Sequence, residues 1–260
     1  MARVYAKIVV VRAAGVETVT LNVPERRNAI GPQMTNELLW ALEDAANAED
    51  VRVVVLTGAG KAFCAGGDFQ QMTGEADAQA LPSKGDYADL LLTMTRFEKP
   101  IVAKVNGHAM GGGLGLVVAA TFALAATGAQ LGTPEIQVGL FPMMIMAVLA
   151  RVVSRRRLVK MMLIGEKVSA EEGARIGLVN EAVAPGDLDA AVSALAAALG
   201  EKSPMTIKLG LRAFAAQDDM DLADALPMLR GRLAECLATD DAREGLMAFL
   251  EKRAPRWTGR

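Results

Sequence analysis

Residues 106–115 read Asn-Gly-His-Ala-Met-Gly-Gly-Gly-Leu-Gly and open residues 105–150, the stretch that decides the fold. Within this stretch only His108 and Glu135 have side chains that titrate near neutral pH. A carboxylate is rarely buried without a partner, and desolvation raises its pKa because it disfavours the charged form. Glu135 is therefore a candidate proton carrier. The glycines before it leave backbone N–H groups free to face a ligand, so we expect a backbone anion hole opposite this carboxylate.

The composition excludes several classes of protein. The chain has 260 residues, of which 52% are hydrophobic and 22% charged, as is typical of a globular protein. A net charge of −2 and an aromatic content of 4% argue against a nucleic-acid partner. Two cysteines and one histidine predict neither a disulfide scaffold nor a metal site.

A membrane protein is not expected either. The charge-free run 105–134 is long enough for a transmembrane helix, but its polar residues and dense glycines argue against one. The first residues lack the apolar core of a signal peptide, so we expect a cytoplasmic protein.

Hydrophobic periodicity predicts an α/β fold. Strands are expected at 4–11, 16–21, 51–57, 101–105, 121–126 and 178–183, the first two joined as a hairpin. Helices are expected at 32–47, 87–97, 143–153, 155–163 and 169–175, and from 187 onward with breaks near 200–204 and 217–219. The order of strand, glycine-rich loop and helix recurs, which indicates stacked ββα turns rather than two unrelated domains.

Glycine-rich loops follow two of the predicted strands, at 58–68 and 107–113. The first fails the dinucleotide-binding pattern because Phe63 stands at its third glycine, and it lacks the upstream glycine of a P-loop. Each loop alone could be a simple turn. If both open at one edge of one sheet, their N–H groups converge on one oxygen, where each donor contributes about 3–4 kcal/mol to transition-state stabilisation.

Several side chains have both a structural and a functional interpretation. Glu135 would be an ordinary surface residue if its flanks were not free of charge. His108 is expected to be a hydrogen-bonded structural residue. Met143 and Met144 are of a type more often found in a core, but their place after Glu135 leaves room for a pocket that binds an apolar tail. Arg26, in a loop beside an anion site, could hold a phosphate.

Several ordered motifs carry a resemblance to a known family. They are 22–29, 62–68, 99–103, 106–113, Pro134-Glu135, Gly165-Glu166, 169–174, 177–179 and 249–253. Together they resemble the crotonase family, also called the enoyl-CoA hydratase/isomerase superfamily. The resemblance implies a spiral of ββα turns over residues 1–195 and a C-terminal helical region, 196–260, of the same structural unit that serves trimerisation.

The resemblance also implies the substrate, the assembly and the site. The substrate would be a coenzyme A thioester, with no tightly bound cofactor, and the assembly a homotrimer or a hexamer made of two trimers. By motif position the N–H groups of Gly67 and Gly112 would hold the thioester oxygen and stabilise an enolate. The residues implied to contact coenzyme A are Arg26, Ala65, Asp68, Phe69 and Gln70, with Phe249 and Lys252 from a neighbouring subunit. Those implied to line the acyl pocket are Gly115, Phe141, Met143 and Met144.

The chain departs from the family pattern at one catalytic position. Hydratases of the family use two glutamates; the second falls on Glu135, but the first falls on Gly115, which has no side chain. A single glutamate is similar to the arrangement in enoyl-CoA isomerases of the family. We therefore expect double-bond isomerisation, with hydration through another water-orienting group as the alternative. We also expect Gly115→Glu to favour hydration if the side chain fits.

Two further interpretations remain open at this point. A catalytically silent protein that binds coenzyme A or acts as a scaffold would have lost the first glutamate without replacement. It would have no reason to keep Glu135 in an apolar wall. A nicotinamide dehydrogenase is disfavoured by the failed dinucleotide pattern.

Overall fold

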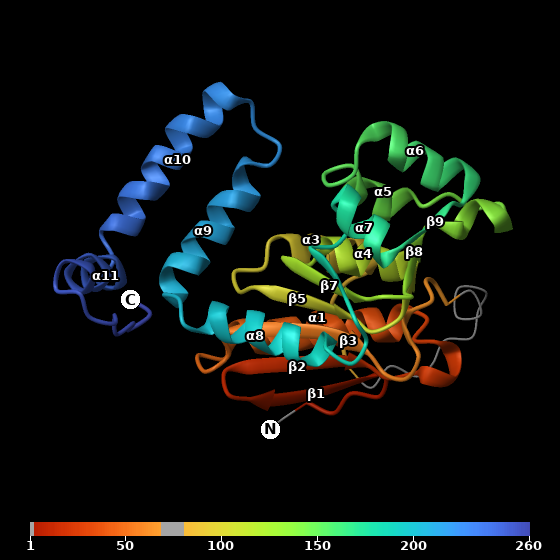
Figure 1. Cartoon of the computed structure of the whole chain (residues 1–260), viewed down its shortest axis with the longest axis horizontal. Coiled ribbons are helices and arrows are strands. Elements are labelled where there is room, and N and C mark those ends of the chain that lie inside the picture. The colour runs from red at the N-terminus through yellow and green to blue at the C-terminus, as the bar shows by residue number, and fades with distance from the viewer. Residues whose placement is uncertain (1–2, 69–80) are drawn as a thin grey trace.

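The computed structural model describes residues 3–68 and 81–260 of the chain. It shows an α/β body from which the last helices of the chain project to one side (Figure 1). The body is built on two sheets, and helices pack against both. The predicted α/β class is therefore confirmed.

The larger sheet, within the described residues, has six strands in the order β1-β2-β3-β5-β7-β10. They are β1 (Ile8–Ala13), β2 (Val16–Leu21), β3 (Val53–Gly58), β5 (Ile101–Val105), β7 (Phe122–Ala126) and β10 (Glu181–Val183). The predicted hairpin is confirmed, because β1 and β2 pair antiparallel, whereas the pairs from β2 to β10 are parallel. β3 is buried along its whole length, as is typical of an apolar strand in a sheet covered on both faces.

The smaller sheet, over the same described ranges, has four short strands in the order β4-β6-β8-β9. They are β4 (Ala62–Cys64), β6 (His108–Met110), β8 (Gln130–Gly132) and β9 (Lys167–Ser169). The prediction of loops over β4 and β6 was wrong. Strands of this length are too short to show alternation, and the glycines beside them are typical of loops. β3, β5 and β7 each continue into a short strand, which forms the corner of a ββα turn.

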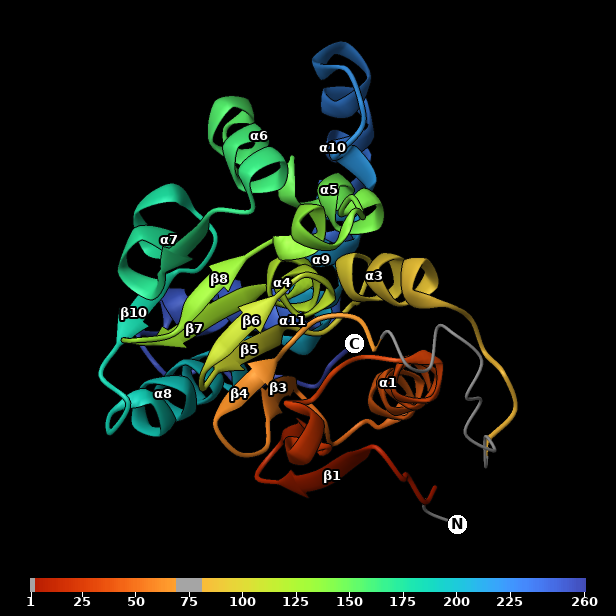
Figure 2. The same ribbon diagram turned by 90° about the vertical axis from the view of Figure 1, so that its right-hand side faces the viewer.

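Helices complete these turns. They are α1 (Pro32–Asn47), α3 (Tyr87–Thr95), α4 (Gly112–Ala119), α5 (Met143–Leu149), α6 (Arg155–Ile164), α7 (Ala170–Ile176) and α8 (Leu188–Gly200), with the 3-10 helices η1 (Pro24–Arg26) and η2 (Pro134–Val138). The sequence did not predict α4, because a helix that begins with glycines has low intrinsic propensity. Figure 2 shows α4 among β6, α3 and α5, and it contacts all of them.

The last helices form an arm that extends from the body: α9 (Pro204–Gln217), α10 (Leu222–Leu237) and α11 (Asp240–Leu250) (Figure 1). The predicted breaks near 200–204 and 217–219 are confirmed. Large apolar side chains are exposed along the arm: Phe214, Leu222, Leu226, Leu233, Leu237, Leu246, Phe249 and Leu250. An exposed apolar surface of this kind is typical of an interaction face. A role of residues 196–260 in oligomerisation stays a prediction that fits this surface.

The predicted boundary after residue 195 falls inside α8. This helix packs Leu188, Val192 and Ala196 against side chains of β3, β5 and β7. α8 therefore belongs to the body along its whole length, and the arm begins after it. The division of the chain into two regions stays a prediction.

Buried Asn28 ties the connection after β2 to the corner between β3 and β4. Its side-chain oxygen accepts a hydrogen bond from the Val23 N–H at 3.0 Å, and its amide donates to the carbonyls of Ala59 and Ala62 at 2.9 Å each. Its φ of 55° is left-handed, a conformation that asparagine adopts more readily than most residues. Because Asn28 is fully buried, water cannot replace these bonds.

Asn28→Ala should lower the free energy of unfolding by about 3 kcal/mol, because it leaves buried backbone groups unpaired and places alanine in a left-handed conformation. Urea unfolding measures this loss. Exposed Asn22 offers a matched control, and Asn22→Ala should change the free energy of unfolding by less than about 0.5 kcal/mol. Equal losses in the two variants would contradict the role assigned to Asn28.

Candidate active site

Two glycine turns meet at the end of neighbouring parallel strands β4 and β6. A Cβ placed on Gly66 would lie 3.1 Å from the Met110 carbonyl oxygen and 3.7 Å from the Gly111 Cα. Gly66 and Gly111 have φ values of 100° and 50°, so both turns need glycine for conformation as well as for space. The prediction that both glycine loops open at one sheet edge is confirmed, and the sheet is the smaller one.

Backbone N–H groups are available on both turns. Gly67 lies beside Ile30, which donates to the Gly66 carbonyl at 2.8 Å and accepts from the Asp68 N–H at 2.9 Å. Within the described residues no hydrogen bond uses the Gly67 N–H itself. Gly112 begins α4, and the N–H groups of a first helical turn have no partner inside the helix. Their predicted role as a pair of oxyanion donors is compatible with this geometry.

Glu135 reaches the same turns from a third ββα unit. It lies in η2, directly after β8, with Pro134 at the first position of the helix. Its Oε1 is 2.6 Å from the point that a Cβ on Gly111 would occupy, so the carboxylate lies against the second turn. Its Oε2 is buried and bonds to none of the described residues. Burial raises the pKa of the Glu135 carboxyl above its ordinary value.

Tyr87 is a member of the site that the sequence analysis missed. It is the first residue of α3, and its hydroxyl donates a hydrogen bond to the Gly112 carbonyl at 2.5 Å. Burial raises the pKa of Tyr87 well above its ordinary value, and negative charge on Cys64 or Glu135 would raise it further. Nothing in the sequence marks this tyrosine, since it sits at the start of a helix far from both glycine loops.

The space beside Gly115 is filled by neighbouring side chains. A Cβ on Gly115 would lie 2.3 Å from the Tyr87 hydroxyl oxygen and 2.5 Å from the Ile145 Cγ2. The condition attached to Gly115→Glu, that the new side chain fits, is therefore not met unless these neighbours shift. The phenol of Tyr87, which comes from α3, occupies the space beside this position.

Arg26 and Asp68 are brought together, as expected for two residues of one binding region. The Arg26 Nη2 lies 2.6 Å from the Asp68 Oδ1, and the Asp68 side chain is buried. The N–H of Ala65 donates to the Arg27 carbonyl at 3.0 Å, which anchors the first turn to the residue after Arg26. The roles of Arg26, Ala65 and Asp68 toward coenzyme A stay predictions. Phe69 and Gln70 lie outside the described residues.

The residues predicted to line the acyl pocket follow η2. Phe141 is half-buried and packs against the core. Met143 and Met144 are 64% and 50% exposed, so they are not core residues. They lie two and one residues before buried Ile145, which contacts the Gly115 position. Their contact with an acyl chain stays a prediction.

The C-terminal candidates lie elsewhere in the chain. Phe249, in α11, is 82% exposed, and Lys252 follows that helix with a left-handed φ of 55°. α11 and helices α5 and α6 lie at opposite ends of the molecule (Figure 1). The contact of Phe249 and Lys252 with the site of another copy of the chain stays a prediction, and their distance from α5 within one chain is compatible with it.

His108 and Cys64 have structural environments. The His108 Nδ1 accepts a hydrogen bond from the Gln130 N–H at 3.0 Å, which agrees with the structural interpretation, although the side chain is exposed. Burial raises the pKa of Cys64 to about 12, so this cysteine stays a thiol. No group of three or more metal-ligating side chains occurs in the part of the chain that the structure describes.

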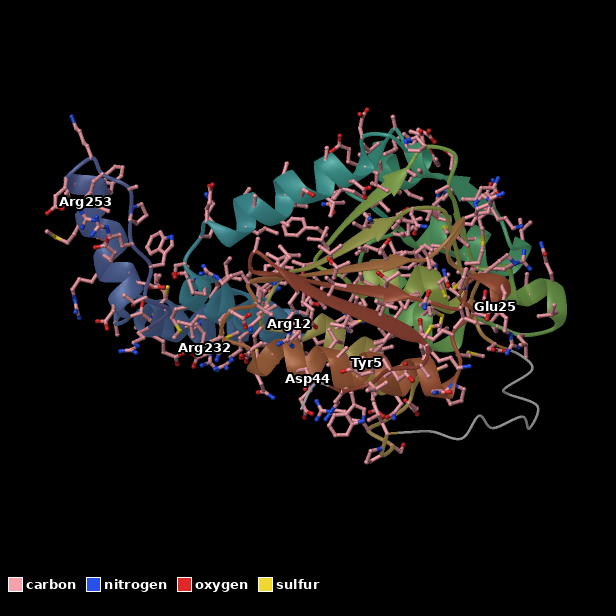
Figure 3. All side chains as sticks on the ribbon, turned by 90° about the horizontal axis from the view of Figure 1, so that it is seen from below. Tyr5, Arg12, Glu25, Asp44, Arg232 and Arg253 are labelled. Carbon is pink, nitrogen blue, oxygen red and sulfur yellow. The ribbon has the colours of Figure 1, made fainter. Side chains whose placement is uncertain are left out.

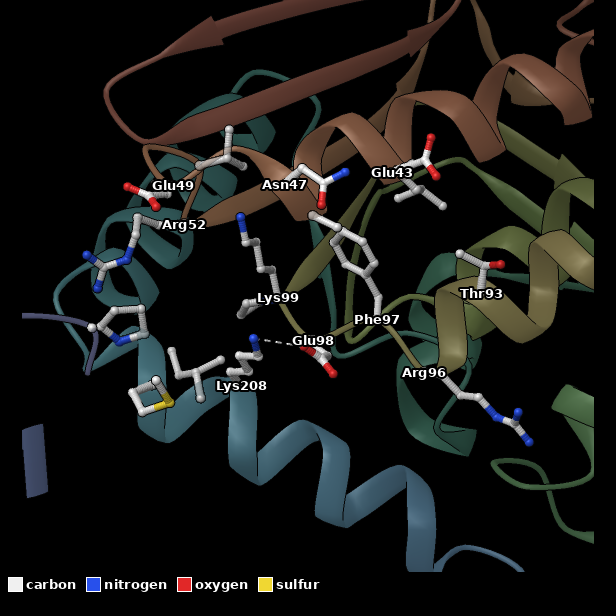
Figure 4. Close-up of a pocket in the computed structure, with 18 of the residues that line it drawn as sticks. Glu43, Asn47, Glu49, Arg52, Thr93, Arg96, Phe97, Glu98, Lys99 and Lys208 are labelled. Carbon is white, nitrogen blue, oxygen red and sulfur yellow. Dashed lines mark ion pairs between the residues drawn. The ribbon is translucent and has the colours of Figure 1, made fainter. Parts of the chain in front are cut away.

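A cavity of about 1000 Å³ lies between α1, the segment before β5 and α9 (Figure 4). Its described lining includes none of the predicted site residues. Its charges are partly neutralised, since Glu98 pairs with Lys208 at 3.4 Å and with Arg212. The Lys99 Nζ donates to the carbonyls of Ala45 and Ala48 at the end of α1. This cavity separates the body from the arm and is distinct from the site at Glu135.

No helix in the described ranges is long and apolar enough to cross a lipid bilayer.

Comparison with known proteins identifies the family. A sequence model described as enoyl-CoA hydratase/isomerase matches residues 11–260. The (E)-benzylidenesuccinyl-CoA hydratase of Thauera aromatica is 35% identical over 93% of this chain and 94% of that protein. The crystal structure of an enoyl-CoA hydratase from Mycobacterium smegmatis has a TM-score of 0.89 and 34% identity, and the match covers 97% of this chain and 99% of that one.

A second structure, an enoyl-CoA hydratase from Bacillus anthracis, has a TM-score of 0.90 at 30% identity, over 98% of this chain and all of that one. Sequence and fold thus agree over nearly the whole chain. The protein belongs to the enoyl-CoA hydratase/isomerase family and is an enzyme of the crotonase fold that acts on coenzyme A thioesters.

Proposed function

We propose that the enzyme moves a proton at the α-carbon of an enoyl-CoA thioester, and that double-bond isomerisation is its reaction. The observation that carries this proposal is the position of Glu135. It is the carboxylate that the described residues bring against the glycine turns, and its Oε2 is buried without a hydrogen bond to them. An unpaired carboxylate oxygen at this place is free to accept a proton from a substrate.

The reaction needs one base and one oxyanion site. The N–H groups of Gly67 and Gly112 hold the thioester oxygen while Glu135 removes a proton from the α-carbon of a 3-enoyl thioester. The electron pair of that C–H bond moves into a dienolate whose negative charge lies on the thioester oxygen. Glu135 then returns the proton to the γ-carbon, which leaves a 2-enoyl thioester. The raised pKa suits this role, because a base is most efficient when its pKa is near the working pH.

A catalytically silent protein that only binds coenzyme A or acts as a scaffold explains the environment of Glu135 less well. A buried carboxylate without a hydrogen bond lowers stability, since its charge is poorly solvated. The carboxyl accepts a hydrogen bond from its own backbone N–H, but its Oε2 has no partner within the described residues. A residue that destabilises the fold and lies against an anion site is better explained by catalysis.

The nucleotide end of the substrate is proposed to involve charges from two subunits. Arg26, held by Asp68 next to the first glycine turn, supplies one cation. Lys252 and Phe249 of a neighbouring copy supply contacts from the end of the arm. This arrangement requires a trimer or a hexamer, and the apolar side chains exposed on the arm support such an assembly.

Hydration of a 2-enoyl thioester is the second candidate. It is favoured by the Tyr87 hydroxyl, which bonds to the Gly112 carbonyl next to the Gly111 position that Glu135 contacts, and by the names of the matched hydratases. Turnover of a panel of 2-enoyl- and 3-enoyl-CoA thioesters would separate the two reactions.

Glu135→Gln should lower turnover by about 10²–10⁴, because the amide keeps the size of the side chain but cannot carry a proton. Steady-state kinetics on the preferred thioester measures the loss. Glu181→Gln, a change at an exposed position of β10, is the control and should keep the activity. Near-normal turnover of Glu135→Gln would show that another group is the base.

Glu135→Gln should also stabilise the protein at neutral pH. Below about pH 4.3, the ordinary carboxyl pKa, Glu135 is protonated in both folded and unfolded states and carries no penalty. As the pH rises through the raised pKa of the folded state, the folded protein gains a poorly solvated charge and loses stability. Thermal unfolding between about pH 4 and pH 8 should show a gain for the variant that grows with pH. A difference that does not depend on pH would contradict the burial of this charge.

Lys252→Ala should weaken coenzyme A binding by about fivefold at low ionic strength, since one exposed charge contact contributes up to about 1 kcal/mol. The difference should shrink at high salt because the contact is screened. Calorimetry at two salt concentrations measures both affinities, and Lys202→Ala, at another exposed lysine, is the control. Equal affinity of wild type and variant at every salt would remove Lys252 from the site.

A further inference from the structure

The hydroxyl of Tyr87 is the second side-chain polar group at the Gly111–Gly112 turn. A Cβ on Gly111 would meet the Glu135 Oε1 at 2.6 Å, and a Cβ on Gly112 would meet the Tyr87 hydroxyl at 3.5 Å. The carboxylate and the phenol therefore lie against consecutive residues of one turn. A ligand bound at this turn is near both groups.

The phenol is held rigidly in this place. Its hydroxyl donates to the Gly112 carbonyl at 2.5 Å, and its ring packs against the core. Gly115 and Ile145 close the space behind the oxygen, since a Cβ on Gly115 would come within 2.3 Å of it. A tyrosine hydroxyl that donates one hydrogen bond can still accept another. Within the described residues its hydroxyl receives no hydrogen bond from a donor, so this capacity to accept is available to a ligand.

Water addition to a 2-enoyl thioester needs a group that one carboxylate cannot supply alone. A water molecule must be held at the β-carbon while its oxygen forms the C–O bond. The π electrons then move to the thioester oxygen as an enolate. Glu135 takes the proton that the water loses and gives it to the α-carbon, so that one H and one OH are added. The group that holds the water must keep its own proton throughout.

We propose that the Tyr87 hydroxyl binds the oxygen at the β-carbon of the acyl chain: the attacking water of a 2-enoyl thioester, or the hydroxyl group of the 3-hydroxyacyl product. Tyr87 accepts a hydrogen bond from that oxygen while it donates to Gly112. The enzyme then hydrates 2-enoyl thioesters, the second candidate reaction, without a second carboxylate and in addition to the isomerisation that needs Glu135 alone. This inference rests on the proposed function, because it needs a thioester bound over Glu135.

The protonation state of Tyr87 agrees with this role. Burial raises its pKa well above the ordinary value, so the phenol remains neutral and does not compete with Glu135 as a base. Cys64, the nearest thiol, is also neutral near pH 7. Glu135 is then the group that carries the proton, and Tyr87 the group that positions the oxygen.

The test separates this role from mere support of the glycine turn. Tyr87→Phe keeps the ring and removes the hydroxyl, and two reactions of the full-length protein are measured in D₂O. One is hydration of 2-butenoyl-CoA. The other is exchange of the α-protons of butanoyl-CoA, which needs Glu135 and the oxyanion site but no group at the β-carbon. Hydration should fall by about tenfold or more, as expected for a lost polar contact to the transition state, whereas exchange should change by less than about twofold.

The chain offers a matched control in Tyr5, its other tyrosine. The Tyr5 hydroxyl bonds to the Asp44 Oδ2 at 3.0 Å beside α1, and both residues are visible together in Figure 3. Tyr5→Phe is the same chemical change away from the glycine turns and should leave both rates unaltered. Thermal unfolding of both variants checks that each is folded.

A second measurement does not depend on the folding of Tyr87→Phe. In the Glu135→Gln background, where no turnover consumes the ligand, 3-hydroxybutanoyl-CoA should bind about fivefold or more tightly than butanoyl-CoA, because the hydroxyl meets Tyr87. Equal affinities would overturn the proposal.

Three kinetic outcomes would also overturn it. Equal losses of hydration and exchange in Tyr87→Phe would mean that the hydroxyl only supports the turn, and unchanged hydration would mean that it has no role. A wild type that exchanges α-protons but does not hydrate 2-butenoyl-CoA would exclude the role of Tyr87 and leave proton transfer by Glu135 intact. A wild type that does neither would refute the proposed function as well.

Discussion

The contact between the turns at Gly66 and Gly111 is the constraint on which the site depends. Neighbouring parallel strands lie about 4.8 Å apart, so two turns that follow them can touch only if neither carries a side chain. The space that remains is lined by backbone N–H groups, which no substitution of a side chain can remove. The side chains that take part in the chemistry must therefore come from other turns of the spiral. Here these residues are Glu135 from the turn after β8 and Tyr87 from α3.

Most buried polar groups of the described body are hydrogen-bonded, although Glu17, Arg157 and Glu166 each leave one buried atom without a hydrogen bond. Buried Asn28 uses both ends of its amide, and the Glu37 carboxylate accepts from the N–H groups of Ala6 and Lys7. In contrast, Glu135 and Thr133, two residues apart, each have a buried oxygen that bonds to none of the described residues. Polar groups left without partners cost stability, and they are tolerated where they serve a ligand. The well-bonded corner at Asn28 offsets part of that cost and holds the first turn in place.

The sequence predicted the architecture because its strongest signals are local. The apolar strands β2, β3 and β5 and the breaks between the C-terminal helices lie where expected. Glu135 was found because its surroundings carry no other charge. The short strands β4 and β6 were missed because glycine propensity outweighed pairing that only tertiary structure supplies.

Tyr87 could not have been found from the sequence in the same way. It reaches Gly112 and Gly115 through the packing of α3 on α4, and a spacing of more than twenty residues along the chain carries no trace of that contact. The exposure of Met143 and Met144 has a similar cause, since it depends on how α5 sits on α4. Local patterns thus located the backbone part of the site, whereas the side chains that complete it depend on helix packing.

Because Tyr87 and Gly115 are in contact, a substitution at one of these positions changes which substitutions the other tolerates. A side chain larger than hydrogen at position 115 meets both the Tyr87 hydroxyl and the Ile145 Cγ2, so replacement of Gly115 requires these two side chains to shift or become smaller. The two substitutions are therefore non-additive, and their order matters. One route from Tyr87 to a carboxylate at position 115 passes through an intermediate with a small residue at both positions. In that intermediate only Glu135 and the backbone turns would act on the substrate. Its activity would show whether an enzyme with one carboxylate can be converted by this route into an enzyme with two.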